Sequence, residues 1–589
     1  MRNQELAKIF YEIANYLAMD EIPFKPYAYE KAALTIETLE GDIEEIYKKG
    51  GKKALEELAG VGKNIAEHIA EYLETGKLKY YNDLKRKTPI NFQELSAVEG
   101  VGPKRAKTLY QKLNVKNLKD LEKAANSHKI ALLFGFGEKT EKNILEGIKF
   151  LKRSKGRFLL NEILPKTKEV YEKLKNIKGV ERVDYCGSLR RMKETIGDVD
   201  FLVAVKESRK PARNASLRLR SDAGRVMDSF VAMPSVVKIW GKGTTKSSVR
   251  TREGFDMDIR VVPKNSYGAA LQYFTGSKEH NIATRRVAMG KGLKLSEYGL
   301  FRGSKMIASV TEEDVYKALG MQWVAPEIRE DRGEVEAALA DKLPKIIGYH
   351  DIKGDLHTHS DWDGGMNSIT EMAKAALEMG YDYIGIADHT KFLRIEHGLN
   401  EKQLERRNKE IDKINLKFQK QKSKFRVLKG CEANILNDGS IDIKDEALKK
   451  LDYVIAGIHS NFKMPKDKMT DRLIRAMENP HVDIISHPTG RILKKRDEYQ
   501  IDFDKVLRAA RETGTVLEVN AWPERLDLND QNIKKAKEAQ VKIVVNTDAH
   551  HKSQLKMMEL GIAQVRRGWA EKKDVINCHP LQKMLMFLK

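Results

Sequence analysis

The chain has 589 residues, which at about 100–200 residues per domain implies three to five domains and excludes a single core. Its 107 Lys and Arg residues outnumber 85 Asp and Glu residues, and the net charge of +22 makes nucleic acid the first expected partner. The three cysteines are far apart and form no CxxC pair, which excludes a disulfide framework and a zinc finger. No leader-like segment and no apolar run of about 18 residues occurs, so we expect a cytoplasmic protein without a membrane role.

Residues 1–150 have the apolar spacing of short amphipathic helices, and one Gly-x-Gly pattern recurs in them three times before a helical stretch. Glycine lets a turn between helices bring backbone N–H groups to an anion, and the next helix adds its partial positive charge. One copy would more simply be a tight turn, whereas three copies favour binding to a nucleic-acid phosphate backbone. The repeats resemble helix-hairpin-helix elements. That resemblance implies sequence-independent DNA binding at Gly60, Gly62, Lys63, Gly100, Gly102, Lys104, Gly135 and Gly137.

Two alternating stretches predict strands with acidic faces, over 198–205 and 256–262, in a region of mixed α and β character. Side chains two apart on a strand point the same way, about 6–7 Å apart, so Asp198 and Asp200 share one face. Carboxylates around two divalent ions suit phosphoryl transfer. An exposed acidic strand is the simpler alternative, but apolar residues flank each acidic pair and favour a site. The stretch 207–221 lacks an apolar period, so we expect an exposed insert without catalytic groups.

Four motifs in this region occur in the order found in family X DNA polymerases, which residues 1–325 resemble. They are Gly187-Ser188 with Arg191, Gly197-Asp198-Val199-Asp200, Asp258-Ile259-Arg260 and Tyr273-Phe274-Thr275-Gly276-Ser277. The resemblance implies that two Mg²⁺ or Mn²⁺ ions are held by the catalytic residues Asp198, Asp200 and Asp258, with Asp258 nearest the primer 3′-hydroxyl. Of the two acids Asp256 and Asp258, the family pattern uses the second, so Asp256 is not included among the metal ligands.

The same resemblance implies a nucleotide pocket. Ser188, Arg191 and Arg157 would hold the triphosphate, a role suited to a hydroxyl and to guanidinium forks. The implied nucleotide-binding residues are Arg157, Gly187, Ser188, Arg191, Gly197, Tyr273, Phe274, Gly276 and Asn281, and Arg285 would contact the template strand. In the first hairpin, the position that matches the family's Schiff-base lysine is His68. An imidazole cannot form that imine, so we expect little or no removal of a 5′-deoxyribose phosphate.

Ten of the fourteen histidines lie after residue 350, and most follow apolar runs separated by helical stretches such as 401–420. Seven runs end in polar groups, namely His357-Thr358-His359, Asp388-His389, Glu432, His459, His487, Asn520 and Asp548-Ala549-His550. Alternating strands and helices with active groups at the strand carboxyl ends predict a TIM-like barrel. Imidazoles and carboxylates gathered at one barrel mouth favour several Zn²⁺, Mn²⁺ or Fe²⁺ ions over scattered core histidines.

Residues 351–575 resemble the polymerase-and-histidinol-phosphatase (PHP) domain. That resemblance implies up to three divalent ions bound by His357, His359, Asp363, His389, Glu432, His459, His487, Asp548 and His550. Within the loop 359–365, Asp361 is an alternative to Asp363. The full ligand set implies an active phosphoesterase.

The expected architecture is multidomain, with an all-α helix-hairpin-helix region, an α+β nucleotidyltransferase palm and thumb, and a distorted (βα)7 TIM-like PHP barrel. The expected ranges are 1–80 and 81–150 for two helical domains, 151–265 for the palm, 266–325 for nucleotide selection, 326–350 for a connector and 351–575 for the barrel.

The two resemblances together imply a monomeric DNA-directed DNA polymerase that fills short gaps during repair. Its partners would be gapped or primer-template DNA and deoxynucleoside triphosphates. The barrel would be a 3′→5′ exonuclease, and the same chemistry would serve an abasic-site (AP) endonuclease. A small-molecule phosphatase is disfavoured by the net charge and the hairpins. A non-catalytic DNA-end-binding scaffold is disfavoured by the intact carboxylates and ligands.

Overall fold

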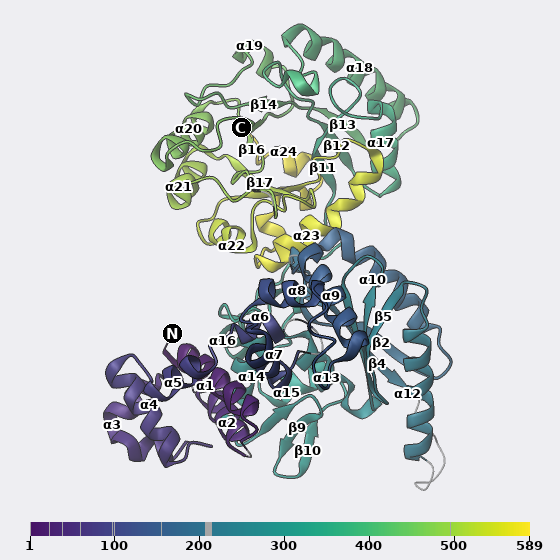
Figure 1. Ribbon diagram of the computed structural model, residues 1–589. Coiled ribbons are helices and arrows are strands. Elements are labelled where there is room, and N and C mark those ends of the chain that lie inside the picture. Colours follow the sequence, from purple (N-terminus) through teal and green to yellow (C-terminus); the bar gives the residue numbers. More distant parts are fainter. Residues whose placement is uncertain are drawn as a thin grey trace. The chain divides into compact units, whose positions relative to one another are not determined.

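The computed structural model describes residues 2–22, 24–37, 39, 41–58, 60–96, 98, 101–154, 156–205, 215–494 and 496–589 (Figure 1). They form two compact units. The first unit comprises Met1–Phe158, Val170–Gly187 and Gly197–Trp323. The second comprises Leu159–Glu169, Ser188–Ile196 and Val324–Lys589. The finer subdivision expected from the sequence stays a prediction.

The first part of the chain is helical, as predicted. Its helices are α1 (Arg2–Met19), α2 (Lys25–Glu37), α3 (Ile43–Glu56), α4 (Lys63–Thr75), α5 (Lys79–Lys87), α6 (Phe92–Ser96), α7 (Pro103–Leu113), α8 (Leu118–Asn126) and α9 (Gly137–Ser154). Side-chain caps begin two of them, since Asp42 accepts from Glu44 N and Asn117 from Asp120 N. Apolar faces pack into one core, with Phe10 and Ile69 fully buried.

The first unit also contains a twisted five-stranded sheet in the order β2-β4-β7-β6-β5. The strands are β2 (Val180–Tyr185), β4 (Asp198–Val205), β5 (Val236–Lys242), β6 (Lys246–Thr251) and β7 (Asp256–Val262). Strands β4 and β7 run parallel, and the other neighbours run antiparallel. The predicted ends of β4 and β7 are confirmed. This sheet positions the acidic residues.

The remaining elements between residues 158 and 339 are divided between the two units. They are β1 (Phe158–Leu159), α10 (Leu160–Lys175), α11 (Gly187–Arg190), β3 (Thr195–Ile196), α12 (Ala215–Val231), α13 (Tyr267–Thr275), α14 (Lys278–Gly290), β8 (Lys294–Ser296), β9 (Gly299–Arg302), β10 (Lys305–Ala308), α15 (Glu312–Ala318) and α16 (Glu334–Leu339). Residues 215–221 of the expected insert begin helix α12, which the sequence did not predict, and their exposure stays a prediction. The apolar side chains that bury this helix, including Phe230, come later in it and were not counted. Residues 206–214 lie outside the described part.

The second unit is built around parallel strands. They are β11 (Gly354–Thr358), β12 (Tyr383–Ile386), β13 (Arg426–Lys429), β14 (Glu432–Asn434), β15 (Ile455–Gly457), β16 (Ile484–Ile485), β17 (Val516–Asn520) and β18 (Ile543–Asn546). Two parallel sheets, β11-β12-β13 and β14 to β18, meet at the short gap after β13. A parallel bridge between Thr358 and Ala549 joins β11 to the residues after β18. The seven expected runs are thus present, one of them divided into two strands.

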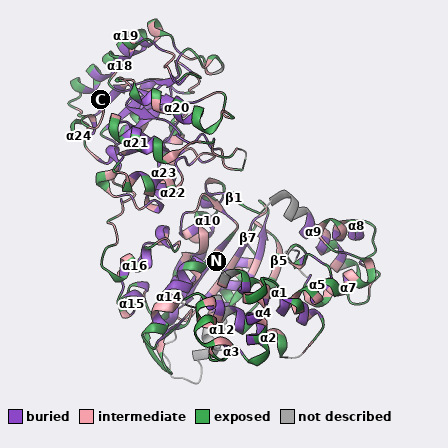
Figure 2. Ribbon diagram, turned by 90° about the vertical axis from the view of Figure 1, so that its left-hand side faces the viewer, coloured by how far each residue is buried: buried purple, intermediate pink, exposed green. Residues whose placement is uncertain are grey.

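Helices surround these strands in the arrangement of a barrel (Figure 1). They are α17 (Ile369–Glu378), α18 (Glu401–Lys420), α19 (Asp445–Leu448), α20 (Lys466–Glu478), α21 (Phe503–Thr513), α22 (Asp530–Glu538), α23 (Met558–Arg567) and α24 (Leu581–Leu585). The strands are buried (Figure 2), except for Arg426 and Lys429 at the two ends of β13, which are partly exposed. Leu356, Tyr453 and Val544 form a second, inner core with Met584 of α24. Polar side chains are therefore concentrated at the carboxyl ends of the strands.

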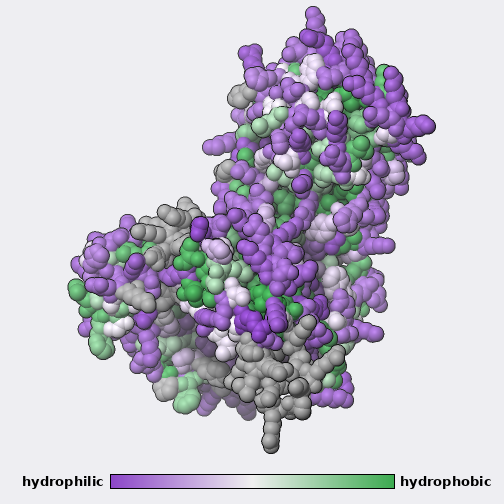
Figure 3. All heavy atoms as spheres, turned by 90° about the vertical axis from the view of Figure 1, so that its right-hand side faces the viewer, coloured by the Kyte–Doolittle hydropathy of each residue, from purple (hydrophilic) through white to green (hydrophobic). Residues whose placement is uncertain are grey.

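The surface and the cysteines agree with the composition. Hydrophilic side chains predominate on the face shown in Figure 3. No helix among the described residues is both long and apolar enough to cross a membrane. Cys186, Cys431 and Cys578 are buried and free, so no disulfide is formed.

Candidate active sites

Three carboxylates come together where β4 and β7 lie side by side. The parallel register pairs Asp198 with Asp256 and Asp200 with Asp258. Val199 and Met257, which separate the two acids on each strand, are buried on the opposite face. All four acids therefore point to one face of the sheet. The alternation seen in the sequence therefore produces the acidic face that it predicts.

The environment of Asp200 is that of a cation site. Burial, with the charges of Asp198 and Asp258 close by, raises the pKa of Asp200 to about 7. Lys246 Nζ lies 2.9 Å from Asp258 Oδ2 and supplies some of the missing positive charge. Carboxylates crowded in this way fit hard divalent ions with oxygen ligands.

Asp256 is held apart from this group. Its carboxylate accepts a 2.7 Å hydrogen bond from Trp240 Nε1 and a 2.9 Å bond from Arg250 Nη2. A carboxylate paired in this way is a structural anchor for β5 and β6. The geometry supports leaving Asp256 out of the ligand set.

Two glycines keep the neighbourhood of the acids open. Gly187 has φ +60°, and a Cβ added there would lie 2.8 Å from Asp200 Oδ2, so a larger residue would be strained and would displace Asp200. At Gly197 the nearest group to such a Cβ is Arg157 Nη1, 3.4 Å away. The structure thus brings Gly187, Gly197 and Arg157 to the acidic strand ends.

The aromatic motif lies at the end of α13 and the start of α14. Tyr273 and Phe274 pack edge to face, with ring centroids 5.1 Å apart. Asn281 Nδ2 donates to Tyr273 O at 2.6 Å, and Asn281 Oδ1 accepts from Gln272 Nε2 at 2.9 Å. Arg285 Nε donates to Asn281 O at 3.0 Å. Gly276 joins the two helices with φ +68°. These predicted pocket residues therefore form one connected group.

Ser188 and Arg191 belong to the second unit. Arg191 is buried, and its Nε lies 3.0 Å from Glu330 Oε1. Ser188 O accepts from Lys193 N at 3.0 Å, which closes the loop on itself.

The three hairpins share one backbone hydrogen bond. Val61 N, Val101 N and Phe136 N each donate to the backbone oxygen three residues earlier, at 3.0 or 3.1 Å. These three side chains are buried. Helices α4 and α7 begin immediately after the second glycine of their repeat, and α9 begins at its second glycine. Lys63 is exposed, and the largely exposed Lys104 pairs with Glu21 at 2.6 Å. Gly100 lies outside the described residues. A helix N-terminus thus follows the turn in each repeat, but Gly137 has a φ of +64°, whereas Gly62 and Gly102 have φ −86° and −78°.

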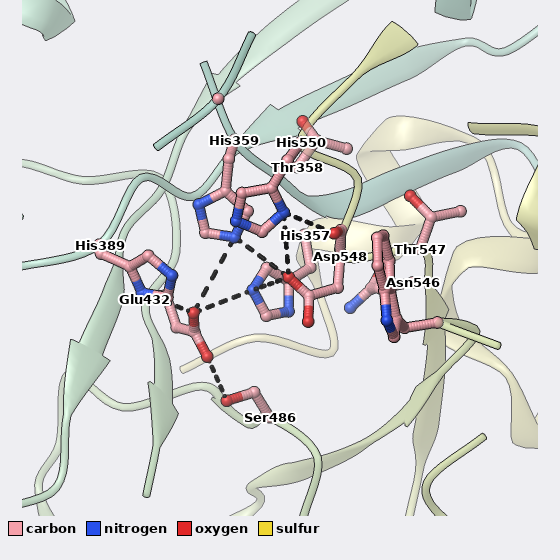
Figure 4. A network of polar contacts seen from close by, with 12 residues as sticks. His357, Thr358, His359, His389, Glu432, Ser486, Asn546, Thr547, Asp548 and His550 are labelled. Carbon is pink, nitrogen blue, oxygen red and sulfur yellow. Dashed lines mark hydrogen bonds and ion pairs between the residues drawn. The ribbon is translucent and has the colours of Figure 1, made fainter. Parts of the chain in front are cut away.

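In the second unit, the buried Glu432 lies among the barrel histidines (Figure 4). Its carboxylate oxygens are 2.9 Å from His389 Nδ1, 3.0 Å from His487 Nε2, 3.2 Å from His357 Nε2 and 3.3 Å from His459 Nε2. Burial alone would raise its pKa, but the imidazoles of His357, His459 and His389 hold the pKa of Glu432 well below its usual range. Glu432 is thus an ionised carboxylate in a ring of imidazoles.

Asp548 forms the second centre of the cluster. Its Oδ1 lies 3.3 Å from His359 Nε2, 3.7 Å from His357 Nε2 and 3.9 Å from His550 Nδ1. The rings of His359 and His550 stack with centroids 4.1 Å apart. Strand ends β11 and β18 supply these residues. The carboxyl ends of the strands thus converge as the sequence predicts.

The donor set fits metal ions. His357 Nε2, His359 Nε2 and His389 Nδ1 are buried and have no hydrogen-bond partner in a suitable geometry, although carboxylate oxygens lie within 4 Å of each. A buried polar atom without a partner is costly, and a cation between these atoms would satisfy them. Groups of three potential ligand atoms lie within 4.8 Å of one another, such as His357, His359 and Asp548.

The loop after β11 favours Asp363 over Asp361. Asp363 is buried, its Oδ2 lies 2.8 Å from His359 Nδ1, and it accepts from His389 N at 2.8 Å. Asp361 is exposed. Asp388, not predicted as a ligand, can also join His359 and Asp363 in one group of potential ligands. It is fully buried and held by Ser360 and by Arg407 Nη1 at 3.1 Å.

Sequence reasoning also missed Glu518. This buried carboxylate accepts from His357 Nδ1 at 2.7 Å and from His487 N at 2.8 Å. The amide groups of Asn520 and Asn546 donate to it at 3.1 and 3.0 Å. The available signal was a charged residue inside the apolar run Val516–Asn520. An acid on a fully buried strand requires polar partners, and here the partners are residues at the mouth of the barrel.

Family models match four stretches of the chain. They are a helix-hairpin-helix domain over residues 1–78, a SAM-like helix-hairpin-helix tandem over 92–149, a DNA polymerase beta thumb over 270–330 and a PHP domain over 355–521.

Three relatives are similar to this chain. A DNA polymerase/3'-5' exonuclease PolX from Bacillus subtilis (strain 168) is 35% identical over 594 residues and covers 100% of both chains. A probable phosphatase from Thermoanaerobacter sp. (strain X514) is 33% identical over 235 residues, which are 38% of this chain and 89% of that protein. A probable phosphatase from Caldanaerobacter subterraneus subsp. tengcongensis is 33% identical over 211 residues, 33% of this chain and 75% of that protein. Of the three, the Bacillus protein matches along the whole chain.

Proposed function

This chain belongs to the family X DNA polymerases that carry a C-terminal PHP domain, and from that membership we propose that it fills short gaps in DNA and removes nucleotides from 3′ ends. The observation that carries the polymerase activity is the grouping of Asp200 and Asp258 on neighbouring strands beside Asp198. The ranges 1–80, 81–150, 151–265, 266–325, 326–350 and 351–575 are the domains of this proposal.

At the polymerase site, Asp198, Asp200 and Asp258 would hold two Mg²⁺ or Mn²⁺ ions, which when bound lower the pKa of the primer 3′-hydroxyl and neutralise the departing pyrophosphate. Asp258 would lie nearest that hydroxyl. Arg157, Ser188 and Arg191 would bind the triphosphate, aided by Gly187 and Gly197, which leave room for it. Support for this assignment comes from the glycine at 187, where a side chain would collide with Asp200.

The remaining pocket residues would select the nucleotide. Tyr273, Phe274 and Gly276 would form the wall beside the sugar, and Asn281 would contact the minor-groove edge of the base. Arg285 would contact the template strand. The hydrogen bonds that fix Asn281 between Gln272 and Tyr273 support a side chain held ready for one geometry.

At the barrel mouth, up to three Zn²⁺, Mn²⁺ or Fe²⁺ ions would supply an activated water nucleophile and neutralise a phosphodiester. The proposed ligands are His357, His359, Asp363, His389, Glu432, His459, His487, Asp548 and His550. Arg525 Nε lies 3.9 Å from Asp548 Oδ2 and adds a positive charge for an anionic substrate. We propose 3′→5′ exonuclease activity here, and AP endonuclease activity as a second use of the same groups.

The proposed partners are gapped or primer-template DNA and deoxynucleoside triphosphates, bound by a monomer. Gly60, Gly62, Lys63, Gly102, Lys104, Gly135 and Gly137 would hold phosphates without reading sequence, because the hairpins offer backbone N–H groups and helix N-termini. The backbone hydrogen bond that recurs in the three repeats supports this.

One assay tests both activities. The full chain is incubated with an end-labelled duplex that carries a short gap, with and without nucleotides, in Mg²⁺ and then in Mn²⁺. We expect gap filling with nucleotides and 3′ shortening without them. Asp258→Ala should abolish gap filling while DNA binding persists, and Asp256→Asn is the matched control that should retain it. A parallel sample with p-nitrophenyl phosphate as the substrate tests the alternative function. A small-molecule phosphatase would hydrolyse this monoester and leave the DNA intact.

A further inference from the structure

The turn of the third hairpin differs from the other two turns in one side chain. Phe136 N donates to Leu133 O at 3.1 Å, and Gly135, with φ +84°, is the third residue of this four-residue turn. Phe134 is its second residue and so lies at the corner of the turn. The residue before the first glycine is alanine in the first repeat and glutamate in the second. An aromatic side chain at this corner is therefore particular to the third hairpin.

The corner carries two exposed apolar side chains. Phe134 is fully exposed, and Leu132, two residues earlier, is 84% exposed. Leu133 between them packs against the helical core, and Phe136 is buried. Among the described residues of 2–154, the one other exposed large apolar side chain is Phe24. A single exposed apolar residue is ordinary, whereas two at one turn form a small patch that a ligand can cover.

The backbone that presents this patch is fixed by the helical core. The buried carboxylate of Glu141 accepts from Ile130 N and from Ala131 N, each at 2.9 Å. The guanidinium of Arg105, on α7, lies 5.6 Å from the centre of the Phe136 ring. The third turn is thus anchored on both sides of its exposed corner, and it lies beside the helix that follows the second hairpin.

The charge around the turn favours a polyanion as the ligand. Residues 92–149 contain eleven Lys and Arg residues against seven Asp and Glu residues. Lys129 and Lys142, which precede and follow the turn in the sequence, are exposed. An apolar corner among cations suits a nucleic acid, whose bases stack on aromatic rings while its phosphates lie near lysines.

The cost of reaching a base selects one kind of DNA. In a continuous duplex each base is stacked on both faces, and a side chain can enter only by separating two of them, which costs free energy. At a gap, the terminal base pairs and the unpaired template base expose faces to water. A ring that covers such a face gains stacking without the cost of separating bases. An exposed aromatic corner should therefore favour interrupted DNA over a continuous duplex.

We propose that Phe134, with the neighbouring Leu132, is a stacking platform for an exposed base at a gap in DNA. This rests on the proposed function, because the ligand is the gapped DNA that the chain would fill. The first two hairpins then hold phosphates in any duplex, and the third adds recognition of the interruption. A second copy of the chain, covering the same patch, is the alternative occupant.

The test compares binding of the full chain to two labelled duplexes of one sequence, one continuous and one with a one-nucleotide gap, by fluorescence anisotropy. Phe134→Ala should weaken binding to the gapped duplex by about tenfold and leave binding to the continuous duplex within about twofold of the wild type. Because the side chain is fully exposed, the melting temperature should be unchanged. Phe134→Trp should keep the preference for the gap, and its added indole fluorescence should be quenched by the gapped duplex alone.

The matched control is Met586→Ala, which removes an 82% exposed apolar side chain from the second unit. It should bind both duplexes like the wild type. Equal weakening on both duplexes in Phe134→Ala, or no change on either, would overturn the platform. Self-association of the wild type that Phe134→Ala abolishes, measured by sedimentation velocity, would also overturn it. If the wild type binds neither duplex, the proposed DNA partner itself fails, a result distinct from a loss confined to Phe134→Ala.

Discussion

Among single residues, Glu518 bonds to the ring nitrogen of His357 that faces away from the cluster. A carboxylate in this position fixes the tautomer of the imidazole and raises its basicity as a ligand. Glu518→Gln keeps the size but brings an NH₂ group toward donors such as His487 N. We expect metal affinity to fall by about 10–100-fold, measured by competition with a chromogenic chelator.

The control for Glu518→Gln is another buried carboxylate of the barrel. Asp483 accepts from Val454 N at 2.7 Å and from Lys589 N at 2.7 Å, and neither donor belongs to the histidine cluster. Asp483→Asn should leave metal affinity as in the wild type. Equal affinity in Glu518→Gln and the wild type would contradict the role assigned to Glu518.

His68 sets a second expectation for a single residue. Its Nδ1 is 2.7 Å from Tyr29 Oη, and its ring stacks on Tyr80 with centroids 4.9 Å apart. Burial lowers the pKa of His68, so the ring is neutral at pH 7 and has no amine for an imine. We expect little or no covalent product when borohydride is added to the protein bound to DNA that bears a 5′-deoxyribose phosphate. Capture on any residue of 1–80 would contradict this.

For the helix-hairpin-helix elements, two glycines permit a substitution that leaves the fold intact. Gly62 and Gly102 have φ −86° and −78°, and a Cβ at either position would meet nothing within 4 Å. The variant with valine at both positions should therefore fold normally, and its two new side chains should obstruct an approaching phosphate. We expect weaker binding to all DNA sequences. The slope of log affinity against log salt should also become shallower, by about 0.9 for each phosphate that the variant no longer binds.

The matched control is Gly41→Val, outside the hairpins, where an added Cβ also has open space. It should bind DNA like the wild type, by fluorescence anisotropy across a salt series. A pronounced sequence preference of the wild type, or equal binding by the hairpin variant, would argue against phosphate binding at these loops.

Elements with strong periodicity could be predicted from the sequence. The strands 198–205 and 256–262 and the helix 401–420 begin and end where expected, because alternation and amphipathic spacing act over their whole length. The break at Gly430–Cys431 and the start of α12 were missed, since both depend on tertiary packing. Histidines that end strands could be found in the same way. Asp388 and Glu518 lie in two of the same runs, but their contacts could not be predicted, because their partners come from other elements and one sequence does not reveal which elements are neighbours.

For the whole molecule, synthesis and hydrolysis should be separable. Asp258 lies in the first unit, and His357 and His359 lie in the second. His357→Ala with His359→Ala removes two proposed ligands and leaves the carboxylates of β4 and β7 unchanged. We expect 3′ shortening to be lost and gap filling to be retained within about twofold of the wild type.

A useful control replaces His397 and His481, which contact none of the carboxylates in the cluster, with alanine. Both activities should remain in that variant. If 3′ shortening continues at the wild-type rate in the variant of His357 and His359, hydrolysis does not take place at the barrel mouth.

The three buried cysteines allow unfolding to be followed by thiol labelling of the unmodified chain. Cys186 lies in the first unit, and Cys431 and Cys578 lie in the second, none of them more than 7% exposed. A thiol reagent can reach such a group only when the surrounding structure opens, so each labelling rate measures the opening of one region. The protein would be labelled at increasing denaturant concentrations, and mass spectrometry of the labelled peptides would then rank the stabilities of the two units without any introduced probe. Because the same thiols are buried in the native protein, it should be inert to mild oxidants.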